Sequence, residues 1–163
     1  MPGPHIVRAS IVDPTIYLIH HGKATDPQVD AQRSLTAAGR AAVNELAAYA
    51  KKRDAIPVEI WHSGKLRARQ TAEAFRAVCS PLASFSMVRG LQSADPSDIM
   101  ADRLVGERRD VMLVGHMPHV ARLQRRLVGR IGAEDQIQFP PHGFMALFSH
   151  DNGVTWREAW RSG

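Results

Sequence analysis

An apolar, strand-like run ends abruptly in two histidines and a glycine, in the sequence Leu18-Ile19-His20-His21-Gly22-Lys23-Ala24. Open α/β sheets bind their ligands in the crevice outside the carboxyl ends of the strands, and His21 would lie there. Gly22 can adopt a positive φ, which lets the backbone approach a bound group closely. The run therefore predicts a buried strand of an α/β sheet that ends in a functional histidine.

Two further polar residues follow strand-like runs in the same way. Arg67 lies in His62-Ser63-Gly64-Lys65-Leu66-Arg67-Ala68-Arg69-Gln70-Thr71, and His116 lies in Val114-Gly115-His116-Met117-Pro118. A single histidine after a strand is usually an ordinary surface or core residue. Three such residues after three strands of one sheet would meet at one edge of that sheet. We therefore expect His21, Arg67 and His116 to form one site.

The spacing of the apolar residues predicts alternating strands and helices. Apolar residues recur at helical spacing from Val43 to Ala50, and Thr36 caps that helix. Val111–Val114 is a continuous apolar run of the kind found in parallel sheets. The predicted strands are about 16–20, 58–61, 85–88, 111–114, 144–148 and 154–160. The predicted helices are 36–52, one from Ser63 or Gly64 to Cys79, one that Asp95 caps and Pro96 begins, and one from Pro118 to just before Gly129.

The order of these elements predicts the fold class. Alternating strands and helices form a three-layer α/β/α sandwich with a mostly parallel central sheet. The turn signal His150-Asp151-Asn152-Gly153 adds a C-terminal antiparallel hairpin, in which we expect Trp156 and Trp160 to pack. Residues 1–14 are predicted to be a loose lead-in, and residues 15–163 a single domain.

The composition favours a cytoplasmic protein with an anionic partner. The sequence has no apolar run long enough to cross a membrane and lacks the layout of a signal peptide. Its single cysteine, Cys79, fits a reducing compartment. The net charge of +5 suits either the steering of an acidic or phosphorylated substrate or a merely solvated surface. Because the cationic residues are spread along the chain without a nucleic-acid motif, we expect neither nucleic-acid nor membrane binding.

From about Ile16 to Trp160 the chain resembles the histidine phosphatase superfamily, and within it the small SixA-like phosphohistidine phosphatases. The features that it shares with them are the His-Gly after the first strand, the helix start Leu35-Thr36-Ala37-Ala38-Gly39, the run from Ser63 to Thr71, and the turn Gly115-His116-Met117-Pro118. The resemblance implies a phosphoglycerate mutase-like fold and a phosphatase that needs no metal and no cofactor.

The resemblance also implies the roles of the site residues. His21 is the nucleophile that becomes phosphorylated, and Arg67 and His116 are catalytic residues that bind phosphate. His20 and Gly22 would line the same phosphate pocket. The chemistry agrees, because an imidazole is a competent phosphoryl acceptor near neutral pH and a transferring phosphoryl group needs fixed donors around its three oxygens.

Arg67 suits that task because its planar guanidinium can donate to two phosphate oxygens, and because the first turn of a helix favours an anion. His116, just ahead of another helix, is placed to donate to the third oxygen. The two cations beside Arg67, Lys65 and Arg69, are expected on a solvated helix face, with weak phosphate steering as the alternative.

His20 stands where this superfamily usually has the arginine of an Arg-His-Gly motif. A histidine replaces a permanent charge by a group with an unperturbed pKa of about 6.5. If His20 lines the pocket, its protonated form can substitute for the arginine, which predicts a pH optimum somewhat below neutral. The alternative is that His20 only fills the space of the arginine.

The second departure concerns the proton donor. Many superfamily members have a Glu in the segment that matches Gly90-Leu91-Gln92-Ser93, and none stands here. Asp95 is the nearest carboxylate, and the favoured interpretation of Asp95 is a helix cap rather than a general acid. The lack of an acid is tolerable when the leaving group is easily expelled, as the imidazole of a phosphohistidine is.

A metal site is an alternative use of the histidines. The candidates are His62, His116, His119 and His142. Two of them, His116 and His119, are three residues apart. That pair lacks the glutamate of a metalloprotease pattern, and the sequence lacks the cysteine pairs of a structural zinc site. We therefore expect no metal.

Three functions remain open. The leading hypothesis is a metal-independent phosphatase that acts through phospho-His21 on protein phosphohistidine. The second is a phosphatase for a small phosphoester or phosphoanhydride metabolite. The third is a module that binds phosphate or a phosphoprotein without catalysis, although such a module would have no chemical reason to keep the nucleophile. Substrate specificity would lie in the segments Thr25–Ser34 and Gly90–Ser97.

Overall fold

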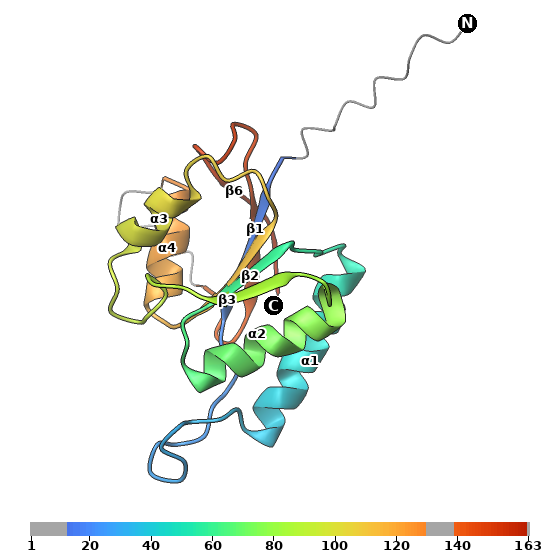
Figure 1. Ribbon diagram of the computed structural model, residues 1–163, viewed down its shortest axis with the longest axis vertical. Coiled ribbons are helices and arrows are strands. Elements are labelled where there is room, and N and C mark those ends of the chain that lie inside the picture. Colours follow the sequence, from blue (N-terminus) through green and yellow to red (C-terminus); the bar gives the residue numbers. More distant parts are fainter. Residues whose placement is uncertain (1–12, 130–138, 163) are drawn as a thin grey trace, which may run out of the picture.

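The computed structural model describes residues 13–129 and 139–162 of the chain (Figure 1). Most of the predicted lead-in, residues 1–12, therefore lies outside the described residues. The described chain forms a six-stranded sheet with the strand order β3-β2-β4-β1-β5-β6. The strands are β1 (Thr15–His20), β2 (Glu59–His62), β3 (Ser84–Met87), β4 (Val111–Gly115), β5 (Phe144–Phe148) and β6 (Arg157–Arg161).

The sheet is mostly parallel. The neighbouring pairs β1 and β4, β4 and β2, and β2 and β3 all run parallel, whereas β5 runs antiparallel to both β1 and β6. Two helices, α1 (Ala37–Lys52) and α2 (Leu66–Cys79), cover one face, and α3 (Ser97–Leu104) and α4 (His119–Leu127) cover the other (Figure 1). The predicted three-layer sandwich with a C-terminal hairpin is confirmed.

Side chains that alternate along β1 reach the two cores of the sandwich. Tyr17 and Ile19 pack with the helices α1 and α2, and Ile16 and Leu18 pack on the opposite side. This alternation is the two-residue period of a strand that is buried on both faces. It explains why the run is apolar throughout, and it holds β1 at the centre of the molecule.

None of the described helices is long and apolar enough to span a membrane.

The helix α1 begins as predicted. The hydroxyl of Thr36 accepts a hydrogen bond of 2.9 Å from the backbone N–H of Gly39, which satisfies one free donor of the first turn. Val43, Ala47 and Ala50 form its buried face. The backbone N–H of Thr36 donates to the carbonyl of Lys23 at 3.0 Å, and that of Thr25 donates to the carbonyl of Ser34 at 2.8 Å, so the segment Thr25–Ser34 forms a closed loop between β1 and α1.

Three helices begin later than the sequence suggested, and for α4 the difference is one residue, His119 in place of Pro118. Gly64 has a φ of +91°, which a right-handed helix cannot accommodate, so α2 begins at Leu66 rather than at Ser63 or Gly64. Asp95 is not the cap of α3, because its carboxylate accepts the backbone N–H of Gln92 at 2.9 Å instead. The helix α3 starts at Ser97.

The C-terminal hairpin has a wider turn than predicted. The carboxylate of Asp151 accepts hydrogen bonds from the hydroxyls of Ser149 and Thr155 and from the backbone N–H of Thr155. These bonds hold residues 149–156 out of the ladder, so β6 begins at Arg157 rather than at residue 154. Trp160 stacks on Phe144 with ring centroids 4.6 Å apart, which confirms the predicted packing role.

The carboxyl ends of the parallel strands meet at one edge of the sheet. His20 at the end of β1 lies opposite Gly115 at the end of β4, and His62 at the end of β2 lies opposite Val114. The backbone N–H of His21 extends the β1–β4 ladder by donating to the carbonyl of Gly115 at 3.1 Å. The residues that follow these strands are therefore neighbours in space.

Candidate active site

The nucleophile predicted from the sequence, His21, is buried at the sheet edge, and one of its ring nitrogens is hydrogen-bonded to the backbone. Its Nδ1 lies 2.7 Å from the carbonyl oxygen of Gly22, and a carbonyl can only accept, so Nδ1 carries the hydrogen. The lone pair of the neutral ring is therefore on Nε2. The ring centroid of His116 lies 4.9 Å away. This arrangement leaves Nε2 of His21 as an unprotonated nitrogen able to attack a phosphorus atom.

Gly22 supports His21 in a different way from the one predicted. Its φ is not positive. Glycine is required there because a Cβ atom would lie 2.5 Å from the side chain of Val43 and 3.1 Å from that of Leu35. The backbone N–H of Gly22 donates to the hydroxyl of Thr71, at 2.9 Å. Gly22 thus anchors the end of β1 between α1 and α2.

Thr71 connects the nucleophile to the arginine. Its buried hydroxyl accepts from Gly22 and donates to the carbonyl of Arg67 at 2.8 Å. One side chain in the second turn of α2 therefore sets the position of the first turn relative to His21. Thr71 ends the run from Ser63 that resembles the histidine phosphatases, but the run alone does not predict this bridging role.

Arg67 is a half-buried cation without a counter-ion. No salt bridge to its guanidinium occurs within residues 13–129 and 139–162, and its buried Nε has no hydrogen-bond partner there. Burial and the charge of Arg33 lower its pKa. A buried, unpaired N–H of a charged group is costly unless a ligand satisfies it. The guanidinium is therefore prepared for an anion.

His116 is oriented through Ser63. The hydroxyl of Ser63 accepts the backbone N–H of Lys65 and lies 2.6 Å from Nε2 of His116, to which it can donate. A neutral His116 would then carry its hydrogen on Nδ1 and present it as a donor. Gln92 reaches the same corner, because its amide donates to the carbonyl of Ser63 at 2.7 Å. The segment Gly90–Ser97 thus borders the site.

The three site histidines are held neutral. Burial lowers the pKa of His21 to about 4, and that of His116 to about 3, with Arg67 adding a further depression in both. Burial and the neighbouring His21 lower the pKa of His20 to about 3. Without a bound anion His20 is therefore neutral in mild acid, because the pocket excludes the water that would stabilise the charge. This lowered pKa opposes the expectation that protonated His20 replaces the missing arginine.

These pKa values predict acid sensitivity of the fold. We expect the free energy of unfolding, measured with urea in phosphate-free buffer, to fall as the pH is lowered from about 6.5 toward 4. In that window the unfolded chain, with ordinary histidine pKa values, binds more protons than the folded one, so acid favours unfolding. The contribution is fully present above pH 6.5.

The variant His20→Gln removes one of these groups and should flatten the dependence of stability on pH. Added inorganic phosphate should also flatten it, because an anion in the pocket favours the charged imidazoles. A slope that is the same in the variant and the parent would contradict the assignment of a buried, neutral His20.

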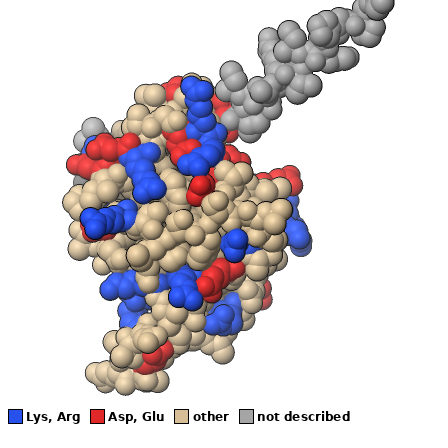
Figure 2. Space-filling view, viewed as in Figure 1, with Lys and Arg blue, Asp and Glu red and all other residues tan. Residues whose placement is uncertain are grey.

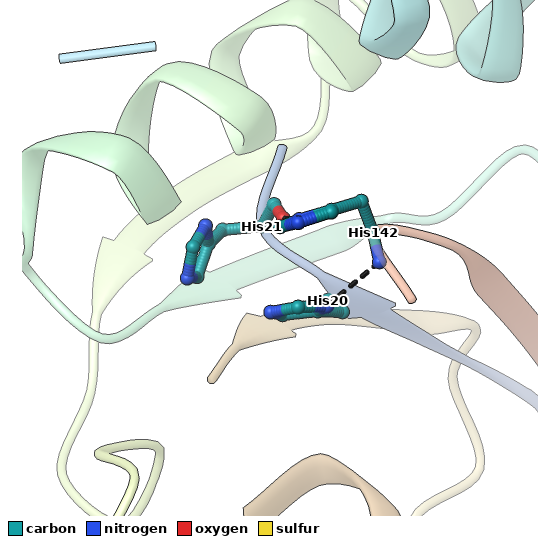
Figure 3. A group of neighbouring side chains, drawn as sticks. All are labelled: His20, His21 and His142. Carbon is teal, nitrogen blue, oxygen red and sulfur yellow. Dashed lines mark hydrogen bonds between the residues drawn. The ribbon is translucent and has the colours of Figure 1, made fainter. Parts of the chain in front are cut away.

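Two site residues were not predicted as such. Arg33, from the segment Thr25–Ser34, is close enough for its charge to lower the pKa values of Arg67 and His21. His142, just before β5, stacks on His20 with ring centroids 4.3 Å apart and an interplanar angle of 14°. Figure 3 shows the two rings one above the other, with His21 beside them. From the sequence, His142 is only a metal-site candidate and Arg33 only part of the segment Thr25–Ser34, because both lie in segments without periodicity.

The rings of His20, His21 and His142 also satisfy the spacing of a metal site, since one nitrogen of each lies within 4.8 Å of the others. The group contains no carboxylate, and the charge of Arg67 acts on both His20 and His21. A divalent cation would be repelled by that charge, whereas an anion would be attracted. The electrostatics therefore favour an anion site.

The two cations beside Arg67 lie on the outside of the helix. Lys65 and Arg69 are exposed, and Arg69 pairs with Glu73, which confirms the predicted solvated helix face.

Comparison with solved structures shows that the fold of this chain is shared with histidine phosphatases of known structure. The structure of a protein assigned as the phosphohistidine phosphatase SixA of Agrobacterium tumefaciens is 24% identical, with a TM-score of 0.75 over 93% of this chain and 98% of that one. The protein histidine phosphatase SixA in complex with tungstate is 21% identical, with a TM-score of 0.78 over 91% of this chain and 96% of that one.

A mycobacterial glucosyl-3-phosphoglycerate phosphatase in complex with VO3 has the same fold, at 17% identity and a TM-score of 0.66 over 92% of this chain and all of that one. No family model matches this sequence, and no curated protein matches it. The likeness to the solved structures establishes a SixA-like, phosphoglycerate mutase-like fold, which confirms the fold expected from the sequence.

Proposed function

We propose that this protein is a metal-independent phosphatase that works through a phosphohistidine on His21, with protein phosphohistidine as its substrate. The observation that carries the proposal is the free Nε2 of His21 next to Arg67, a cation without a counter-ion. A nucleophile held unprotonated beside an unsatisfied guanidinium is the pair that phosphoryl transfer requires.

In the first step, Nε2 of His21 attacks the phosphorus of the substrate. An N–P bond forms to His21 as the N–P bond of the substrate breaks, and the departing imidazole keeps the electron pair and takes up a proton from water. Arg67 and His116 donate to the phosphoryl oxygens and stabilise their spread charge. In the second step water attacks the phosphorus, phosphate leaves, and His21 regains its lone pair.

The choice of protein phosphohistidine rests on the leaving group. Asp95 is engaged by Gln92, and Gln92 itself is an amide bonded to Ser63, so neither is prepared to protonate an alkoxide. An imidazole needs less assistance to leave than an alcohol does. The SixA structures, named for phosphohistidine phosphatases, are also among the best structural matches.

A small phosphorylated metabolite is the second candidate. The solved structure of a glucosyl-3-phosphoglycerate phosphatase has this fold. Arg33, whose charge reaches Arg67 and His21, could bind a second anionic group of such a substrate.

Figure 2 shows Lys and Arg side chains interspersed with Asp and Glu side chains on the face in view, so that face offers no continuous basic surface.

The proposal is tested by trapping the intermediate. Brief incubation with a phosphoramidate donor should leave phosphate that is labile to acid and stable to base, and peptide mapping should locate it on His21. A chelator should leave the rate unchanged. Label on another side chain, no label in a rapid quench, or turnover that zinc alone restores would each contradict the mechanism.

The substrate class is decided by a comparison of three compounds: a phosphohistidine peptide, an aryl phosphate and an alkyl phosphate. The kcat/KM should fall in that order, because the leaving group needs increasing protonation. The variant His150→Ala is a suitable control, since His150 is exposed at the opposite end of the sheet and should be labelled like the parent. A preference for the alkyl ester would favour the metabolite phosphatase.

A further inference from the structure

His142 has a backbone conformation that non-glycine residues rarely adopt. Its φ is +49°, in the left-handed region, and the residue is exposed. Strain of this kind persists where surrounding contacts compensate for it. Here the contacts are all to the end of β1, and they involve both the backbone and the ring of His142.

The backbone N–H of His142 determines the tautomer of His20. This N–H lies 2.7 Å from Nδ1 of His20 and can only donate, so Nδ1 must carry a lone pair (Figure 3). A neutral His20 therefore bears its hydrogen on Nε2. That nitrogen has no hydrogen-bond partner within the part of the chain that the structure describes, and its ring lies 4.6 Å from the ring of His21 between centroids.

The ring of His142 makes a second set of contacts with the end of β1. Its Nδ1 donates to the carbonyl of His21 at 2.6 Å, while its plane stacks on His20. The backbone of the segment is joined to β1 once more, because the N–H of His20 donates to the carbonyl of Gly143 at 3.0 Å. His142 is thus hydrogen-bonded through its backbone N–H to the ring of His20 and through its own ring to the backbone carbonyl of His21.

We infer that His20 and His142 act as a pair in which His142 positions His20 as a neutral N–H donor, through Nε2, to an oxygen of the bound phosphate. The fixed tautomer of His20 supplies a hydrogen-bond donor to phosphate at the position where the arginine of an Arg-His-Gly motif supplies a permanently charged donor. This inference rests on the proposed phosphatase function. It differs from a charged role for His20, because a neutral donor acts at any pH at which the fold persists.

The role of His20 is tested with a matched pair of amides. The side-chain nitrogen of Gln can reach the position of Nε2 of His20, whereas that of Asn reaches only the position of Nδ1. Loss of a hydrogen bond to a charged group lowers kcat/KM by about 10- to 100-fold. We therefore expect His20→Asn to have a kcat/KM at least about tenfold below that of His20→Gln. Equal losses in the two variants would overturn the inference.

The role of His142 is tested with two residues that tolerate positive φ. His142→Asn keeps a side-chain donor for the carbonyl of His21, and His142→Gly removes both this donor and the stacked ring. The Gly variant should lose about tenfold in kcat/KM and the Asn variant less. In the background of His20→Asn the Gly variant should lose almost nothing further, because His142 acts through His20. Additive losses would show that His142 has a separate structural effect and would overturn the inference.

A measurement without turnover separates this inference from the proposed function. In the ¹⁵N NMR spectrum of the parent, Nδ1 of His20 should be unprotonated and Nε2 protonated near neutral pH, and added inorganic phosphate should shift the Nε2–H resonance. A protonated Nδ1, or an Nε2–H that phosphate leaves unmoved, overturns the pair even if the enzyme is active. The expected spectrum from a protein that hydrolyses none of the three substrates would support the phosphate-binding pair and contradict the phosphatase.

Discussion

Replacement of His21 by Ala should abolish turnover, with kcat reduced on the order of 10⁴-fold or more. The variant lacks the lone pair of Nε2 that forms the N–P bond, a lone pair that the hydrogen bond from Nδ1–H of His21 to the carbonyl of Gly22 fixes in place. Steady-state hydrolysis of a phosphohistidine peptide and of an aryl phosphate measures the loss. The phosphoramidate label should disappear at the same time.

The matched control for this variant is His150→Ala, which removes an exposed histidine whose ring pairs with Asp13 far from the site. It should retain the parental kcat. Circular dichroism and thermal melting establish that His21→Ala is folded, and binding of inorganic phosphate tests whether its pocket is intact. A folded His21→Ala protein with more than about a hundredth of the parental rate would contradict covalent catalysis by His21.

Replacement of Arg67 by Lys should lower kcat/KM about 10- to 150-fold, and replacement by Ala should lower it further. Lysine keeps a charge but cannot donate two parallel N–H groups to a phosphoryl group. The Ala variant should also move the acid limb of the rate profile to higher pH. Arg67 helps to depress the pKa of His21 from its ordinary value to about 4, and removal of the positive charge lets that pKa rise.

Arg69→Lys serves as the control for Arg67→Lys, because Arg69 lies in the same helix but is exposed and paired with Glu73. Exposed pairs of this kind contribute little, so its kinetics should be near parental. The profile is measured as kcat/KM against pH with a substrate whose own ionisation does not change over the range. Near-parental kinetics of both Arg67 variants would mean that Arg67 does not face the phosphate.

The features that the sequence predicted well depend on local physical rules. The alternation of β1 and the apolar run of β4 follow from burial on both faces of a central strand, and the start of α1 at Thr36 follows from the free N–H groups of a first helical turn. Errors arose where one local signal competed with another. Gly64, with its positive φ, delayed the start of α2, and Asp95 bonded backward to Gln92 instead of capping α3.

The sequence by itself determined the fold class and the assembly of His21, Arg67 and His116 at one edge, because parallel strands must end together. Only the tertiary structure decided the protonation and the partners of these residues. His142 lies 122 positions from His20, and they meet because β5 pairs antiparallel with β1. The pKa of His20 falls because that packing excludes water, and burial is a property of all the surrounding elements together rather than of any one segment.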